Sequence, residues 1–457
     1  MPLQKNQVLT LRVERLSSDG SGVAHSPDGE TVFIPGAAPG DEARVRIVKD
    51  CRRYAFGILD EVLTPSPDRI PVDCAVAGPC GGCSLRHLDY AAELRAKQEN
   101  VADAFARIGG LDVPVLPIVD SPEVNRYRNK VQFPVGVDKS GKPCIGFYAG
   151  RTHRIVPCPD CRLQPGVLNE IGNALCAFFA EKGIQPYSEE TGKGLVRHIF
   201  LRRGAHSGQI MVCLVCTRAK LPYAEELCTR LKAQFAEITT ILLNVNSKNT
   251  NVILGTETHT LYGPGYIEDT LCGVPVQLGP LSFYQVNTLA AEQLYGIAAQ
   301  YAQLTPDDLL LDLYCGMGTI GLSMADHCRE LIGVEIVPEA IESAKANAAR
   351  MGADVAAKSR FFCADAGQAA TRLAAEGLQP DVVMLDPPRK GCDEATLSAV
   401  VRMSPRRVVY VSCNPATAAR DAAWLEQNGY HAEKVQPVDL FPRTRHCEVV
   451  SCYTKTM

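Results

Sequence analysis

The chain has 457 residues, 46% of them hydrophobic and 21% charged, which is enough to bury the cores of two or three domains. Its apolar runs all fall short of the roughly 18 residues that a membrane span needs, and "MPLQKNQVLTLRVERL" lacks the basic-then-apolar order of a secretion signal. We therefore expect a cytoplasmic protein that does not bind a membrane. The sequence indicates no obligate protein partner, so a monomer is the default expectation.

The net charge of −4 disfavours nucleic-acid binding through overall charge, but the basic residues are unevenly distributed. A locally basic surface can bind phosphates although the chain as a whole is acidic. An ordinary solvated surface would explain the clustered basic residues equally well. One basic stretch, residues 193 to 220, contains no carboxylate. A separate group of basic residues lies near the N-terminus and comprises Arg44, Arg46, Lys49, Arg52 and Arg53.

Residues 1 to 62 contain short apolar-alternating segments, such as "VLTLRVERL" and "TVFIPG", separated by Gly, Pro and Asp. Strands this short, each followed by turn residues, predict a small antiparallel barrel of the oligonucleotide-binding type. The proline-rich "TPSPDRIP" (64 to 71) follows as a stiff linker. The sequence thus predicts a separate N-terminal barrel.

The 19 cysteines are not expected to pair as disulfides in a cytoplasmic protein, so their spacing is a guide to metal binding or catalysis. Cys74, Cys80 and Cys83 are closely spaced in "CAVAGPCGGC", and "VPCPDC" later supplies Cys158 and Cys161. Three clustered thiols with a distant fourth suit a four-iron cluster and also tetrahedral zinc. The spacing predicts a metal site without deciding between the two metals.

A helix-like segment rich in Ala, Glu, Lys and Leu covers residues 88 to 108, and residues 125 to 265 mix strands with helices. Cys213 and Cys216 lie within the apolar strand "GQIMVCLVCT". Because residues three apart on a strand point to opposite faces, we expect both thiols to be core residues.

From about residue 300, apolar strands alternate with Ala-rich helices, a pattern that predicts a doubly wound parallel sheet. Ligands of such sheets bind beyond the carboxyl ends of the strands. We therefore expect an α/β protein with three parts: a barrel at 1–62, an α+β central domain at 63–270 that holds the metal cysteines, and a Rossmann-like domain at 271–457.

The first strand-to-helix turn of that domain, "LLLDLYCGMGTIGL", contains Asp312 before Gly316 and Gly318. Glycines let a ligand approach the backbone, and Glu335 ends the next strand, where it can accept hydrogen bonds from a ribose. The turn lacks the third glycine of a dinucleotide site. An acid on the strand before the glycines instead suits the ammonium group of S-adenosylmethionine.

A third strand ends in "VVMLDPPRKG", where Asp386 precedes two prolines. A turn that caps the next helix would explain the prolines, but it would not explain why an apolar strand ends in a charged residue. We therefore expect Asp386 to project into the ligand cleft. N-methyltransferases that hold a planar base often carry an aromatic residue after the two prolines. Arg389 occupies that place here, which disfavours amine methylation.

The strand "RVVYVSC" ends in Cys413, at the same predicted edge of the sheet. A thiolate beside a methyl donor suggests addition to carbon 6 of uracil, which makes carbon 5 nucleophilic enough to accept a methyl group. A base must then remove the carbon 5 proton. Glu448, just before the last apolar strand, is one candidate base, and His446 is the other. The alternative for Cys413 is a buried structural thiol.

In their order and approximate spacing, several motifs resemble those of the RNA uracil-5-methyltransferases, which make 5-methyluridine in transfer and ribosomal RNA. They are "SFYQVNT", "DLYCGMGTIGL", "GVEI", "LDPPRKG", "VYVSCNP" and "HCEVV". The resemblance implies that Cys413 is the nucleophile and Glu448 the base. The residues that it implies as contacts of the methyl donor are Gln285, Tyr314, Glu335 and Asp386, with Asp365 as a further one.

The N-terminal segment resembles a TRAM domain, an RNA-binding module, through "GSGVAH" and "TVFIPGAAPGDEARVRI". The transfer-RNA branch of the family commonly lacks this module. The ribosomal-RNA branch often has an iron–sulfur cluster, for which the resemblance implies Cys161 as the fourth ligand. We therefore expect a 23S ribosomal RNA substrate and a [4Fe-4S] cluster. The alternatives are transfer RNA as substrate, a non-catalytic RNA-binding protein and, because of the cysteines, an oxidoreductase.

Overall fold

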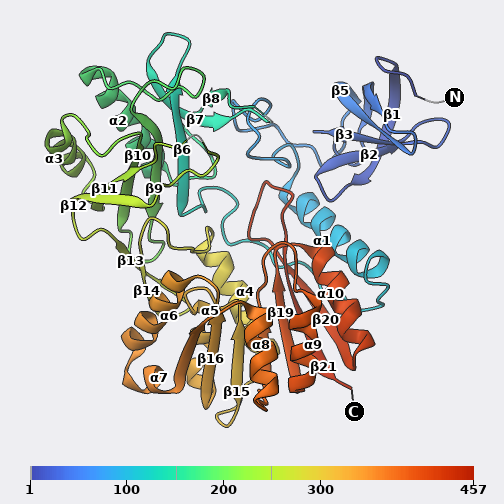
Figure 1. Cartoon of the computed structure of the whole chain (residues 1–457). Helices are drawn as coiled ribbons and strands as arrows, with labels where there is room; N and C mark the ends of the chain where they lie inside the picture. The colour runs from blue at the N-terminus through green and yellow to red at the C-terminus, as the bar shows by residue number, and fades with distance from the viewer. Residues whose placement is uncertain (1–2, 151, 249, 457) are drawn as a thin grey trace.

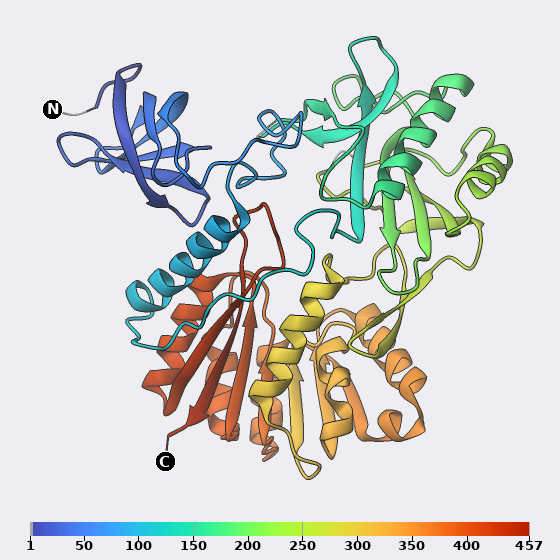
Figure 2. The ribbon, with the colours of Figure 1, turned by 180° about the vertical axis from the view of Figure 1, so that it is seen from behind.

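The computed structural model describes residues 3–150, 152–248 and 250–456, and it has three parts (Figures 1 and 2). A small barrel and a sheet-containing central lobe both lie above the same edge of a larger C-terminal α/β layer, and the barrel and the lobe lie on opposite sides of the molecule. Among the described residues, no helix is both long and apolar enough to span a bilayer.

The N-terminal part is a closed five-stranded barrel in the order β1-β2-β3-β5-β4. Buried and exposed residues alternate along its strands, so small aliphatic side chains fill the interior. The barrel was predicted to be antiparallel, but β3 and β5 pair in parallel, which closes the sheet on itself. The strands are β1 (Val8–Leu16), β2 (Ser21–His25), β3 (Thr31–Pro35), β4 (Glu42–Asp50) and β5 (Tyr54–Thr64).

The segment after the barrel forms helix α1 (Tyr90–Arg107), as the composition predicted. Asp89 caps its N-terminus by accepting a hydrogen bond from Ala91 N at 2.7 Å. The helix packs against α10 (Pro415–Gln427) and β20 (Tyr430–Val438) of the C-terminal part, far away in the sequence (Figure 2). This helix therefore joins the N-terminal segment to the end of the chain.

The central lobe is built on a seven-stranded sheet in the order β12-β11-β10-β9-β6-β7-β8. On β10, Cys213 and Cys216 lie in hydrophobic clusters on opposite faces of this sheet, as predicted. Its strands are β6 (Lys130–Val137), β7 (Pro143–Tyr148), β8 (Ile155–Pro157), β9 (Val196–Arg203), β10 (Ile210–Cys216), β11 (Ile238–Val245) and β12 (Glu257–Tyr262). Its helices are α2 (Gly166–Lys182) and α3 (Ala224–Gln234), and the hairpin β13 (Ile267–Leu271) and β14 (Val274–Leu278) leads onward.

The C-terminal sheet has the order β17-β16-β15-β18-β19-β21-β20, with helices on both faces (Figure 1). Its strands are β15 (Leu309–Leu313), β16 (Glu330–Glu335), β17 (Ser359–Cys363), β18 (Val382–Leu385), β19 (Arg407–Ser412), β20 and β21 (Glu448–Lys455). The helices are α4 (Thr288–Ala302), α5 (Thr319–Ser323), η1 (Ala325–His327), α6 (Pro338–Met351), α7 (Ala353–Lys358), α8 (Ala366–Ala375), α9 (Glu394–Met403) and α10. This is the predicted doubly wound α/β fold.

One strand departs from the predicted parallel arrangement. β21 runs antiparallel to β19, with Ser412 opposite Val449, and β20 pairs with it in antiparallel fashion. The first residue of β21 therefore lies at the edge where β15, β16, β18 and β19 end. That edge faces the barrel and the central lobe (Figure 1).

Candidate active site

The turn after β15 forms one side of the candidate site. Asp312 is 1% exposed, and its Oδ2 accepts a hydrogen bond from Gly321 N at 3.0 Å. Its other oxygen, Oδ1, is buried and has no hydrogen-bond partner among the residues that the structure describes. Gly316 has φ +55° and open space where a Cβ would lie, so a ligand can approach this backbone closely. The turn thus pairs an unsatisfied acid with an accessible backbone.

Glu335 ends β16 beside this turn. Its carboxylate accepts hydrogen bonds from Gly316 N at 3.2 Å and from Val337 N at 2.9 Å, which orients it toward the turn. Ile336 follows and is 60% exposed, so an apolar surface adjoins the acid. Asp365, at the end of the neighbouring strand, caps α8 by accepting from Gln368 N at 3.1 Å. The exposed Ile336 is a feature that the motif spacing did not predict.

Gln285 approaches the turn from the loop before α4. Its main-chain carbonyl oxygen accepts from Asn129 Nδ2 at 2.7 Å, and its side chain interacts with the hydroxyl of Tyr295. That hydroxyl lies 3.4 Å from Thr319 Oγ1, at the start of α5. Gln285 is therefore linked to the glycine turn through Tyr295. No motif in the sequence predicted this link.

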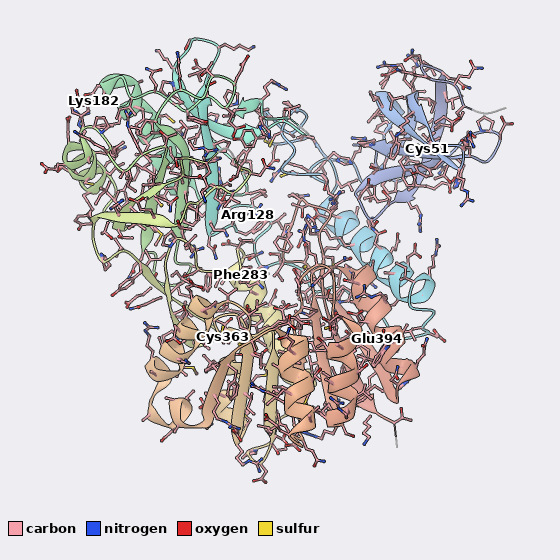
Figure 3. All side chains as sticks on the ribbon, in the orientation of Figure 1. Cys51, Arg128, Lys182, Phe283, Cys363 and Glu394 are labelled. Carbon is pink, nitrogen blue, oxygen red and sulfur yellow. The ribbon has the colours of Figure 1, made fainter. Side chains whose placement is uncertain are left out.

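Two aromatic side chains on these loops differ in orientation. Tyr314 has φ 66°, and its hydroxyl lies 3.4 Å from Thr396 Oγ1, so the ring is directed toward α9. Phe283 is 70% exposed. Figure 3 shows Phe283 and Arg128 in the region between the central lobe and the C-terminal sheet. An exposed aromatic ring and a guanidinium group thus lie near the edge that carries the acids.

Cys413 and Glu448 meet at the same edge because of the antiparallel register. Cys413 follows the last residue of β19, and Glu448 is the first residue of β21, directly across from it. Asn414 then caps α10 by accepting from Ala416 N at 3.2 Å, and Pro415 occupies the first turn of that helix. The strand thus ends with the thiol at its exit, as the sequence indicated.

Asp386 completes the group of acids. It follows β18 directly, whereas the next helix is capped by Asp393, so Asp386 is not a helix cap. Burial raises the pKa of Asp386 to about 7 and that of Asp312 to about 8. Both acids lack a cationic partner among the described residues, which suits a positively charged ligand. The donor set therefore fits the ammonium and sulfonium charges of S-adenosylmethionine.

The two candidate bases differ in proton affinity. Glu448 is 5% exposed, and burial, with a smaller contribution from Asp386, raises its pKa to about 8. His446 is half-buried, and burial together with nearby cations such as Arg389 lowers its pKa to about 4. A base works best when its pKa lies near the working pH, so the electrostatics favour Glu448.

Arg389 acts electrostatically on the Cys413 thiol. Burial and the neighbouring Glu448 raise the pKa of this thiol, and the positive charge of Arg389 partly offsets that increase. The Arg389 carbonyl oxygen accepts from Asn414 Nδ2 at 3.0 Å and from Thr417 Oγ1 at 3.3 Å. The turn that ends β19 therefore holds Arg389 beside the thiol. Motif spacing did not indicate that these two side chains meet.

A buried ionic cluster holds the loop before Glu448. Lys97 Nζ, on α1, lies 2.7 Å from Glu93 Oε1 and 2.8 Å from Asp439 Oδ1, and all three side chains are at most 2% exposed. Glu93 Oε1 also accepts from Arg443 N at 2.7 Å. Helix α1 thus fixes both ends of the segment that leads to Glu448.

The predicted metal ligands gather around one loop of the central lobe. The thiols of Cys80 and Cys83 both interact electrostatically with Cys161, and Cys74 interacts with Cys80. The thiols of Cys158 and Cys161 also interact with each other, and this interaction lowers the pKa of Cys161 to about 6. Within residues 3–150, 152–248 and 250–456, however, no group of three or more such side chains is arranged to hold a metal ion. The geometry does not support the predicted metal site.

The strand order of the C-terminal sheet, its glycine turn and the acids at its edge define a class I S-adenosylmethionine-dependent methyltransferase. The model of the tRNA (uracil-5-)-methyltransferase family matches residues 207–455, and that of the TRAM domain matches residues 2–59. The chain therefore belongs to the RNA uracil-5-methyltransferase family and carries an N-terminal TRAM domain.

Relatives of known sequence and structure resemble the chain over nearly its whole length. An uncharacterized RNA methyltransferase of Halalkalibacterium halodurans is 43% identical over 98% of this chain and 97% of its own. One from Listeria monocytogenes is 42% identical over 98% of each chain. The crystal structure of a tRNA (uracil-54, C5)-methyltransferase from Pyrococcus abyssi, in complex with S-adenosyl-L-homocysteine, has a TM-score of 0.78 and 26% identity, and covers 98% of this chain and 100% of that one.

Proposed function

We propose that the protein methylates carbon 5 of uridine in RNA and that Cys413 and Glu448 are its catalytic residues. The observation that carries the proposal is the pairing of these two residues at the edge where Asp312, Glu335 and Asp386 converge. A non-catalytic RNA-binding scaffold would not need a thiol and a buried acid of raised pKa at that edge. An oxidoreductase is disfavoured because the chain belongs to a methyltransferase family.

The reaction needs a nucleophile and a base on one side of the ring. The Cys413 sulfur forms a bond to carbon 6, and the ring double-bond electrons move so that carbon 5 can accept a methyl group. S-adenosylmethionine supplies that methyl group when it is bound. Glu448 then takes the carbon 5 proton, the electrons of that C–H bond restore the ring double bond, and the sulfur–carbon 6 bond breaks to release the thiolate.

The acids would hold the methyl donor. The turn around Gly316 and the buried Asp312 suit its amino-acid end, and Glu335 with Ile336 suits its ribose and adenine. Gln285, Tyr314 and Asp365 remain proposed contacts.

We expect the rate at which free methylated RNA is released to rise with pH, because Glu448 removes the carbon 5 proton after methyl transfer. Glu448 acts as a carboxylate, and its pKa of about 8 means that the ionised fraction falls about tenfold for each pH unit below that value. The raised pKa of the Cys413 thiol acts in the same direction. Single-turnover rates of release of methylated RNA from the protein, measured between pH 6 and 9, check this expectation. A rate that is flat over that range would contradict the assignment of Glu448.

We propose 23S ribosomal RNA as the substrate, with transfer RNA as the alternative. The cysteine spacing supports ribosomal RNA. The barrel supports it less, because the Pyrococcus abyssi transfer-RNA enzyme aligns with 98% of this chain, barrel included. We expect a deletion strain to lack 5-methyluridine at one or more ribosomal positions, as mapped by mass spectrometry. A mark lost only from transfer RNA would replace this substrate with the alternative, and no lost mark in either RNA would overturn the function.

The metal site also stays a proposal. Thiols at Cys74, Cys80, Cys83 and Cys161 have the donor chemistry of a [4Fe-4S] cluster, with zinc as the alternative, and Cys158 can replace Cys161. The electrostatic interactions among these thiols support a metal site. Their arrangement does not support it, because the described side chains do not form a metal-binding group. Iron and acid-labile sulfide analysis of protein purified without oxygen decides the question, since absence of iron, sulfide and zinc would end the proposal.

A further inference from the structure

A buried cation of the central lobe contacts the loop that precedes α4. Arg202, on β9, is 1% exposed, and its guanidinium donates hydrogen bonds from Nη1 to Gly279 O at 2.8 Å and from Nη2 to Ser282 O at 2.7 Å. Both carbonyl oxygens belong to residues 279–286, which lie between β14 and α4 and which we call the 279–286 loop. The central lobe therefore contacts the C-terminal part through this side chain.

The burial of Arg202 opposes folding unless the guanidinium has a role. Among the described residues it has no carboxylate partner, and its Nε is buried without an acceptor. Burial lowers the pKa of this guanidinium to about 10. A charge that leaves water without a counter-charge loses hydration that two carbonyl oxygens only partly replace. Methionine or leucine would fill the space without this loss, so the two carbonyl contacts indicate a role for the charge.

Asn129 holds the other end of the 279–286 loop. Its main-chain N donates to Val286 O at 2.8 Å, and its Nδ2 donates to Gln285 O at 2.7 Å and to Thr288 Oγ1 at 2.9 Å. Asn129 directly precedes β6, the strand that pairs with β9. Arg202 and Asn129 therefore attach the two ends of the loop to neighbouring strands of the central lobe.

The loop depends on these polar contacts because it contributes little apolar surface to the core. Within residues 279–286, all of which the structure describes, Tyr284 is the one buried residue, whereas Leu281 is 65% and Phe283 is 70% exposed. The loop also carries Gln285, whose side chain interacts with the Tyr295 hydroxyl beside the glycine turn. The conformation of the loop therefore decides where Gln285 lies relative to that turn.

We propose that Arg202 is a positioning residue of the methyl-donor site, which fixes the 279–286 loop so that Gln285 lies beside the glycine turn. Because Arg202 is buried, its effect on the donor passes through the loop. The helix that follows the loop, α4, lies directly below the central lobe (Figure 2). The inference rests on the proposed function, in which Gln285 contacts the donor, and it gives the central lobe a part in donor binding.

Arg202→Met tests the proposal against a matched variant at the other end of β9. Arg197 is 5% exposed, and its Nη1 also donates to two main-chain carbonyl oxygens, those of Asn246 and Lys248. Arg197→Met therefore removes a similar buried guanidinium from a different loop. The probe is S-adenosyl-L-homocysteine, with its dissociation constant measured by calorimetry and the melting temperature of each variant recorded. We expect Arg202→Met to weaken binding about five- to tenfold, the equivalent of one hydrogen bond, and Arg197→Met to stay within about twofold of the unchanged protein.

A double-variant cycle separates positioning from general destabilisation. Gln285→Ala removes the proposed donor contact, so Arg202→Met/Gln285→Ala should bind S-adenosyl-L-homocysteine no more weakly than Gln285→Ala alone. If Arg202→Met does not fold, Arg202→Lys takes its place in the cycle, because lysine keeps the charge but lacks the planar fork that donates to two carbonyl oxygens. In turnover, KM for S-adenosylmethionine should rise while kcat stays within about twofold.

Three results would each overturn the positioning role. They are additive losses in the cycle, unchanged affinity of Gln285→Ala, and equal affinities of the Arg202 and Arg197 variants. The binding measurement uses no RNA, so its outcome stands even if the unchanged protein transfers no methyl group to uridine. That separate result would overturn the proposed function alone.

Discussion

Replacing Cys413 with alanine is expected to abolish methyl transfer, with a loss of at least about 10³-fold, because the proposed mechanism needs this thiol to form the bond to carbon 6. Cys413→Ala removes little volume at the mouth of β19, so folding and RNA binding should persist. The measurement is transfer of a radiolabelled methyl group to RNA, with RNA affinity determined in parallel.

Cys363→Ser provides the matched control. Cys363 is an exposed cysteine that ends β17, at the same edge of the same sheet (Figure 3). Strands β16, β15, β18 and β19 separate it from β21, which begins at Glu448. This variant should keep its activity, which would show that the position beside Glu448 matters and not the thiol alone. A transcript containing 5-fluorouridine adds a direct readout, because a base cannot remove fluorine from carbon 5 in the way that it removes a proton. The last step of the reaction is therefore blocked. The unchanged protein should stay covalently bound to it and Cys413→Ala should not, and failure to trap the unchanged protein would contradict the mechanism.

Replacing Glu448 with glutamine is expected to trap the reaction after methyl transfer. The amide has nearly the same shape but cannot take the carbon 5 proton, so the sulfur–carbon 6 bond cannot break. We expect turnover to fall by about 10²- to 10⁴-fold. Methylated RNA should accumulate as a covalent complex with the protein, visible as a slowly migrating band on a denaturing gel.

His446→Ala distinguishes the rival base. The low pKa of His446 makes it a weak base, so this variant should release its product normally. Accumulation of the covalent complex in His446→Ala and not in Glu448→Gln would reverse the assignment. The double variant Cys413→Ala/Glu448→Gln should form no complex, which confirms the identity of the linked sulfur.

Short-range sequence patterns were sufficient to predict the main secondary-structure elements and the fold class. The alternation of apolar strands with Ala-rich helices predicted the C-terminal fold, and the turn residues predicted a barrel of short strands. The position of Asp312 on a strand and of Asp386 and Cys413 at strand ends followed from apolar runs that stop at a polar residue. Each of these features depends on neighbours in the sequence.

Contacts between distant segments were not predictable in the same way. The i, i+4 pair Glu93 and Lys97 has the spacing of a solvated helix face, yet both side chains are buried against Asp439. The cysteine spacing suggested a metal site, yet among the described residues no group of three or more such side chains is arranged to hold a metal ion. Spacing along the chain limits which side chains can meet but does not fix their arrangement in space.

The sequence by itself determined which residue types stand at the ends of the strands, because a strand's apolar run and its stop are local properties of the chain. Only the tertiary structure decided that Glu448 faces Cys413, because this depends on β21 running antiparallel beside β19. Strand direction and register are set by packing between segments that are far apart in the sequence, and the same packing buries Glu448 and raises its pKa to about 8.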